Sequence, residues 1–96
     1  MQRNYELVYI VSPDISEEGL EATIERIGRL VSNQGGTVEQ VNIWGRRRLA
    51  YPIKRFHEGS YVQTLLTLPA DGVRSLEDSF RVAEDVIRHL LVHLEE

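Results

Sequence analysis

The stretch YELVYIV at residues 5–11, followed by SPD at residues 12–14, sets the starting point for the fold. β-Branched and aromatic side chains dominate the stretch, and such residues favour β-strands. The Ser-Pro-Asp sequence favours a turn and ends the pattern. Together they predict a buried or half-buried strand near the beginning of the sequence.

A helix is predicted directly after this strand. Ser16 is a good N-cap, and Glu17 and Glu18 would occupy the first turn, where the helix dipole stabilises carboxylates. Gly35-Gly36 ends the segment. Between these limits the apolar residues recur at helical spacing and predict an amphipathic helix: Leu20, Ile24, Ile27, Leu30 and Val31.

The rest of the chain predicts two further strands, a second helix and a last segment of ambiguous type. We expect a strand at residues 37–50, with a bulge at Gly45 and an end at Tyr51-Pro52, because proline cannot donate to a strand ladder. A basic loop at residues 53–59 would lead to a third strand at residues 60–68, and Pro69 would open the next helix. Residues 86–94 fit a helix or a strand, and closing the sheet favours a strand. The resulting β-α-β-β-α-β order is a known compact motif, here as a single domain over residues 1–96.

The bulk composition excludes several protein classes. No cysteine is present, so disulfides, thiolate metal sites and cysteine nucleophiles are excluded. No apolar run approaches the roughly 20 residues that span a bilayer, and the first residues lack the apolar stretch of a signal peptide. We therefore expect a cytoplasmic, soluble protein without a membrane partner.

Charge is distributed unevenly along the chain. The formal net charge is −4, but residues 37–59 alone carry +3, while residues 1–36 carry −3 and residues 60–96 carry −4. The basic segment contains the run GRRRLAYPI at residues 45–53, flanked by Trp44. Arginine forks fit phosphate oxygens, and the rings of Trp44 and Tyr51 offer faces for stacking unpaired bases. The alternative is a solvated strand edge protected by charge. The uneven charge favours a local nucleic-acid contact on one face.

The sequence gives little support for catalysis or metal binding. Gly35-Gly36 lacks the third glycine and the lysine of the phosphate-binding loops. His89 and His93 would share one face but have no acidic partner in a zinc-site pattern. We expect no enzyme, no metal and no cofactor. Tyr5, Tyr9 and Tyr61 are predicted to fall on one exposed sheet face, as packing, partner-contact or base-contact residues.

Three segments together resemble the bacterial small-subunit ribosomal protein S-six family: RNYE at residues 3–6, WGRRRLAYPI at residues 44–53, and FR with VIR between residues 80 and 88. The resemblance covers essentially the whole chain. It implies a ferredoxin-like βαββαβ sandwich, with two helices on one face of a four-stranded antiparallel sheet. It also implies a non-enzymatic role in the small ribosomal subunit: binding 16S ribosomal RNA as a heterodimer with the basic ribosomal protein S-eighteen, without a small-molecule substrate.

The resemblance also assigns candidate RNA-binding residues. Arg46, Arg47, Arg48 and Tyr51 fall in the family's signature run, and Arg3 and Arg88 occupy its basic positions near the first and last strands. Lys54 and Arg55 are added from local charge alone. Many relatives carry a charged C-terminal extension, whereas this sequence ends at Leu94-Glu95-Glu96.

Two other functions remain open on the sequence. One is a small-molecule regulatory module, since similar βαββαβ sandwiches can dimerise around a ligand. The other is a protein-binding adaptor that uses the aromatic sheet and an exposed strand edge. The first predicts stabilisation by a ligand and indifference to RNA, and the second predicts partner binding that is insensitive to mutation of the arginine run.

Overall fold

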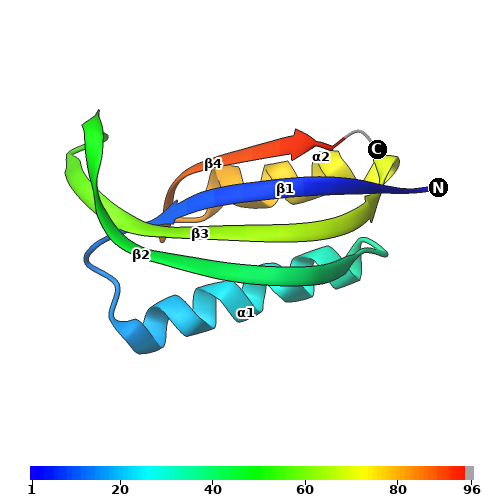
Figure 1. Ribbon diagram of the computed structural model, residues 1–96, viewed down its shortest axis with the longest axis horizontal. Coiled ribbons are helices and arrows are strands. Elements are labelled where there is room, and N and C mark those ends of the chain that lie inside the picture. The colour runs from blue at the N-terminus through cyan, green and yellow to red at the C-terminus, as the bar shows by residue number, and fades with distance from the viewer. Residues whose placement is uncertain (95–96) are drawn as a thin grey trace.

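Four antiparallel strands form a sheet with two helices on one face in the computed structural model, which describes residues 1–94 (Figure 1). The elements are β1 (Gln2–Val11), α1 (Glu17–Asn33), β2 (Thr37–Ile53), β3 (Phe56–Pro69), α2 (Val73–Val82) and β4 (Val86–His93). The strand order is β2-β3-β1-β4. This confirms the β-α-β-β-α-β order and the strand interpretation of residues 86–93. Glu95 and Glu96, at the end of the predicted domain, lie outside the described residues.

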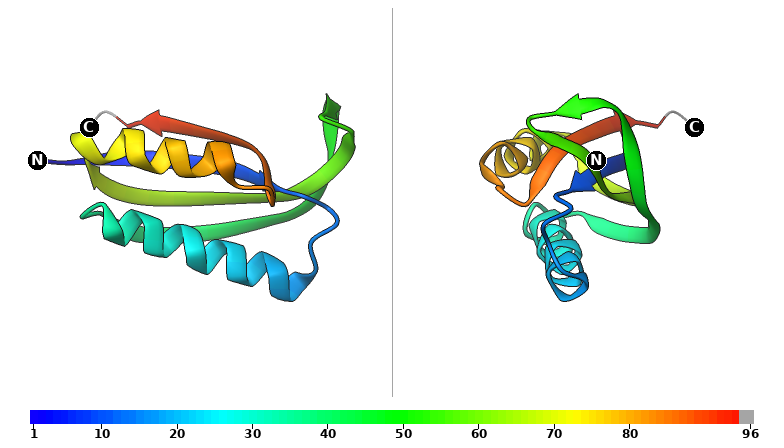
Figure 2. Two further views of the ribbon diagram at one scale, coloured as in Figure 1. Left: turned by 180° about the vertical axis from the view of Figure 1, so that it is seen from behind. Right: turned by 90° about the vertical axis from the view of Figure 1, so that its left-hand side faces the viewer.

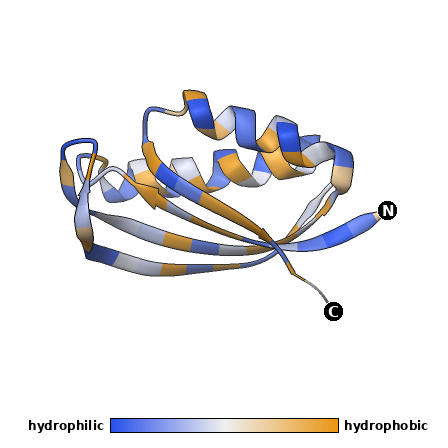
Figure 3. Ribbon diagram, turned by 90° about the horizontal axis from the view of Figure 1, so that it is seen from above, coloured by the Kyte–Doolittle hydropathy of each residue, from blue (hydrophilic) through white to orange (hydrophobic). Residues whose placement is uncertain are grey.

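β1 lies between β3 and β4, and its second half, residues 7–11, is apolar on both faces. Leu7 and Val11 are fully buried on the face that the helices cover, and Ile10, on the other face, is 6% exposed. The predicted cap of α1 is present, since the Ser16 hydroxyl accepts a hydrogen bond from the amide of Gly19 at 3.1 Å. Both helices pack on the same side of the sheet (Figures 2 and 3). The opposite side, here called the open face, carries no helix.

The prediction that three tyrosines share an exposed face was wrong. Tyr5 and Tyr9 are 6% and 0% exposed, and both lie in the main core. The Tyr9 ring packs against Phe80 of α2, with ring centroids 5.9 Å apart. Only Tyr61 lies on the open face, because it pairs with Ile10 in the register between β3 and β1. Residues 7–11 are apolar on both faces of β1, so their alternation alone did not indicate which set of residues faces the helices.

Two predicted strand limits were also wrong. β2 continues through Tyr51 and Pro52 to Ile53, and β3 begins at Phe56, so the expected basic loop is a two-residue turn, Lys54-Arg55. Pro52 is tolerated because the β2–β3 register shifts between Arg48 and Ile53, which leaves Pro52 without a paired residue on β3. The predicted bulge at Gly45 is confirmed by a register shift after Ile43 and by a φ of 90°. Pro69 ends β3, and the 3₁₀ turn η1 (Ala70–Gly72) leads into α2.

A polar cluster ties α1 to the segment that enters β4. One oxygen of the Asp85 carboxylate accepts a hydrogen bond from Thr23 at 2.6 Å, and the other accepts one from Arg26 at 2.8 Å. Burial alone would raise the pKa of Asp85, but the hydrogen bonds from Arg26 and Thr23 outweigh it and hold that pKa below its ordinary value. The charged carboxylate is therefore the form that stabilises the fold.

We expect Asp85→Asn to lower the free energy of unfolding at pH 7 by roughly 1.5–3 kcal/mol, the size of a lost charge-assisted hydrogen bond. A carboxyl whose pKa is depressed in the folded state stabilises the fold above the pKa of the unfolded chain and loses this effect as the pH falls. The difference between wild type and variant should therefore stay constant above about pH 5 and shrink below about pH 4. Urea unfolding from pH 7 to pH 2.5 measures it, and a difference that does not shrink as the pH falls would contradict the assignment.

Candidate nucleic-acid interface

The distal part of the β2–β3 hairpin, residues 45–59, carries the basic segment and is called the hairpin arm below. It rises steeply at one end of the sheet to the level of β4 (Figure 1). The bulge at Gly45 marks where the arm begins, and such bulges bend and twist a strand. The Tyr51 hydroxyl of the arm accepts a hydrogen bond from Arg88 of β4 at 2.7 Å. The two outer strands of the sheet are thus in contact through side chains at this end.

The three adjacent arginines of the arm do not form one cluster. Along β2, Arg46 lies opposite Ser60, Arg47 opposite Gly59, and Arg48 opposite Glu58. Because side chains alternate along a strand, Arg47 points to one face of the arm and its two neighbours point to the other. All three are exposed, so each is accessible to a polyanion.

The surroundings of these arginines differ. Arg46 donates to Glu58 at 3.2 Å and to the carbonyl of Pro13 at 2.8 Å, so its charge is partly neutralised. The guanidinium of Arg47 lies over the Trp44 ring, 5.5 Å from the centroid. Arg48 forms no ion pair or hydrogen bond with another side chain of residues 1–94. Of these three adjacent arginines, Arg47 and Arg48 are therefore more available than Arg46.

The turn at the end of the arm adds two more exposed cations. Lys54 has a φ of 60°, the left-handed conformation that the tight turn requires. The guanidinium of Arg55 lies 4.9 Å from the centroid of the Phe56 ring. Together with Arg88, the structure brings seven of the eight candidate residues to one end of the sheet.

Arg3 is the exception. It pairs with Leu68, whereas Arg88 pairs with Ile10, seven residues further along β1. At about 3.3 Å per residue, the two arginines are roughly 23 Å apart along the sheet. Arg3 does not extend the basic surface of the arm, and any RNA contact it makes is a separate one.

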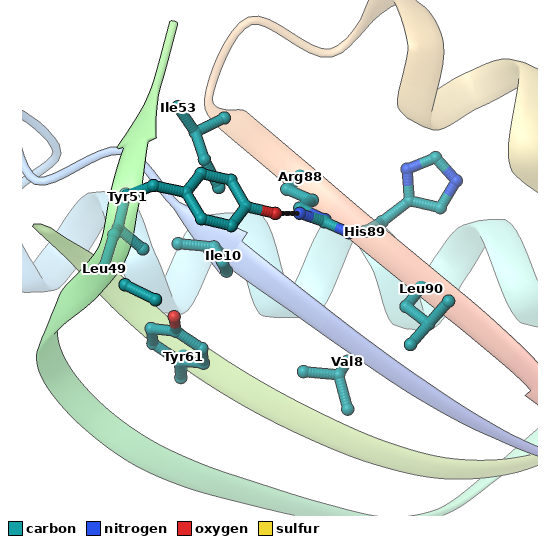
Figure 4. A pocket seen from close by; sticks show the side chains of 10 residues that line it. Val8, Ile10, Leu49, Tyr51, Ile53, Tyr61, Arg88, His89 and Leu90 are labelled. Carbon is teal, nitrogen blue, oxygen red and sulfur yellow. Dashed lines mark hydrogen bonds between the residues drawn. The ribbon is translucent and has the colours of Figure 1, made fainter. Parts of the chain in front are cut away.

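A pocket of about 280 Å³ lies between the hairpin arm and the open face (Figure 4). Apolar side chains from β1, β2 and β4 line most of it: Val8, Ile10, Leu49, Ile53 and Leu90. The phenol rings of Tyr51 (β2) and Tyr61 (β3) and the Arg88 side chain (β4) also line it. Sequence reasoning singled out Tyr51 and Arg88 as candidate RNA contacts and Tyr61 as a residue of an exposed sheet face, but it did not bring the three together in one pocket. The signal it left unused is the continuous apolar run of β1, which indicates burial on both faces.

The two histidines of β4 lie on the side of the sheet that faces the helices. His89 stacks on Phe80, with centroids 4.6 Å apart, and its Nε2 is 3.8 Å from a carboxylate oxygen of Glu77. His93 lies beside Tyr5 at 5.3 Å. Among residues 1–94 there is no cluster of three side chains suited to hold a metal ion. A search of the same residues for a helix that is both long and apolar enough to span a membrane found none.

Comparisons with known proteins agree on one family. The sequence model described as ribosomal protein S6 matches residues 4–93. The small ribosomal subunit protein bS6 of Clostridium botulinum is 39% identical over 90 residues, which cover 94% of this chain and 96% of the relative. The protein of the same name from Clostridium kluyveri is 42% identical, with 92% and 93% covered. Among solved structures, the 30S ribosomal protein S6 of Thermotoga maritima superposes with a TM-score of 0.92 at 29% identity, covering 98% of this chain and 89% of that one.

Proposed function

Because this chain belongs to the ribosomal protein S6 family, we propose that it binds 16S ribosomal RNA as a heterodimer with ribosomal protein S-eighteen. Members of this family are structural components of the small ribosomal subunit, so the chain is not an enzyme. Its ferredoxin-like fold matches that of the Thermotoga maritima relative. The proposal places it on cytoplasmic ribosomes, with the hairpin arm as the main RNA contact.

The observation that carries the proposal is the concentration of positive charge at one end of an acidic molecule. Within a chain of net −4, the arm at residues 45–59 carries five Lys and Arg residues and one acidic residue, and the fold adds Arg88 to that end through its contact with Tyr51. Phosphate contacts by such cations fix the position of a protein on RNA, whereas the shape of the RNA supplies specificity. The arm is therefore suited to position the protein on folded RNA.

The negative charge of the chain outside the arm supports the proposed heterodimer. Outside the arm, the segments 1–36 and 60–96 carry net charges of −3 and −4. Surfaces of this sign repel RNA and attract a basic protein, so complementary charge favours a basic partner over a second RNA contact. A heterodimer with the basic S-eighteen protein would let the two chains share the RNA.

Binding to a small-subunit platform RNA fragment, with and without the S-eighteen protein, tests the proposal across a salt series. If roughly 3–6 phosphates are contacted, the logarithm of the affinity should fall against the logarithm of salt concentration with a slope of about −2 to −5. We expect tight binding when the partner is present. Absence of RNA binding under both conditions would contradict the proposal and favour the ligand-module or adaptor function.

A further inference from the structure

The pocket beneath the hairpin arm has an apolar wall and two phenol rings, and phosphate contacts alone would not involve them. Its volume of about 280 Å³ is just below the roughly 300 Å³ at which ligand pockets begin, so it accommodates one ring system rather than an extended ligand. Two phenol rings, those of Tyr51 and Tyr61, approach it from different strands (Figure 4). Tyr51 and Leu90, on opposite sides of the pocket, are 58% and 57% exposed, so part of the apolar wall faces solvent.

The positive charge of the pocket indicates which class of ligand it binds. No residue that lines it is acidic, and Arg88 lies in the wall with its guanidinium bonded to the Tyr51 hydroxyl at 2.7 Å. The neighbouring arm adds further positive charge. An occupant with a flat, weakly polar ring and an attached anion fits both the apolar wall and this cation.

We propose that the pocket holds one unpaired nucleotide of the bound RNA, with its base against the Tyr51 and Tyr61 rings and its phosphate on Arg88. The inference rests on the proposed function and deepens it by assigning a base-binding site beside the phosphate-binding arm. An apolar side chain of a protein partner would fill the same wall but would leave the cation of Arg88 without an anion. Complementary charge therefore favours the nucleotide.

A pair of matched variants tests the pocket. Leu90→Glu places a carboxylate in the pocket wall, and Val82→Glu makes the same change of charge on α2, where Val82 is 80% exposed. We expect Leu90→Glu to weaken binding of the platform RNA by about 5- to 150-fold, the range of one lost base–aromatic stack. Val82→Glu should bind within about twofold of wild type, and Tyr51→Leu should reproduce the loss without adding charge.

Methyl NMR separates base insertion from phosphate contact. Hexauridylate and inorganic polyphosphate are titrated into the wild-type chain, and the methyl groups of Leu49, Ile53 and Leu90 are followed. A base in the pocket shifts these resonances through its ring current, whereas polyphosphate engages the cations without such shifts. Hexauridylate-specific shifts together with the Leu90→Glu loss are the expected result.

The remaining outcomes overturn the inference in distinguishable ways. If wild type binds the platform RNA but the Leu90 and Val82 variants bind equally and the methyl groups do not shift, the pocket is not a base site and the proposed function stands. If the pocket variants lose binding of the protein partner measured without RNA and keep RNA affinity, the occupant is a protein side chain. If wild type binds no RNA, the proposed function fails together with the inference.

Discussion

The double variant Arg47→Gln/Arg48→Gln is expected to bind platform RNA about 15- to 30-fold more weakly than wild type at 0.15 M salt. Each lost phosphate contact lowers the slope of log affinity against log salt concentration by about 0.7–0.9. Extrapolated from 1 M to 0.15 M salt, this change in slope is roughly a four- to sixfold loss of affinity per contact. Both side chains are exposed, and neither forms an ion pair with any residue of the described range. Their charges are therefore free to neutralise phosphates.

Arg46→Gln is expected to have a smaller effect. Its guanidinium already pairs with Glu58 at 3.2 Å and with the Pro13 carbonyl, so RNA must compete with existing partners.

Filter binding over a salt series measures all of these variants. Arg74→Gln/Arg81→Gln on α2 is the matched control, because it removes the same charge from the helix-covered side of the sheet. Equal losses from the two double variants would show a general charge effect rather than a local interface, and an unfolded arm variant would make these arginines structural.

Local patterns predicted most of the fold because its elements carry local signals. The turn after residue 11, the Ser16 cap and the bulge at Gly45 each depend on neighbouring residues, and all three are present. The closing strand at residues 86–93 was chosen by topology, since its sequence alone fits a helix or a strand. The end of β2 was predicted wrongly because a strand accepts Pro52 only where the register shifts against β3, and no local sequence pattern indicates that shift.

The site was predictable only in part, for the same reason. The arginine run is visible in the sequence, but the pairing of Arg46 with Glu58 depends on the β2–β3 register. The pocket brings together residues from four strands, and its contact between Tyr51 and Arg88 joins positions 37 residues apart. Arg3 was grouped with the other arginines through the family resemblance, and only the strand register shows that it lies at the far end of β1. The RNA-binding role of each of these residues remains a prediction.

Gly59→Ala is expected to lower the free energy of unfolding by about 1–3 kcal/mol, the cost of overpacking a filled core. Gly59 is buried on β3 where the arm leaves the sheet. An added Cβ would overlap the Cγ2 methyl of Ile10, lie 3.1 Å from the carbonyl oxygen of Val11 and 3.6 Å from the Cδ1 methyl of Ile87. Ile10 and Ile87 belong to the small core beneath the arm, so the overlap pushes β3 and β1 apart at the base of the pocket.

Thermal unfolding measures the effect, with an expected fall in Tm of roughly 5–20 °C for a domain of this size. Gly28→Ala is the matched control, because nothing lies within 4 Å of the added Cβ and the residue is inside α1. There the same methyl group should raise stability by up to about 1 kcal/mol, since alanine favours helices over glycine. Gly59 does not have the positive φ found at Gly35 and Gly45. A fall in stability on substitution would therefore come from lack of space for the Cβ rather than from backbone strain. A Gly59→Ala chain as stable as wild type would mean that the arm can move away from β1, and its pocket would then not be a fixed feature of the fold.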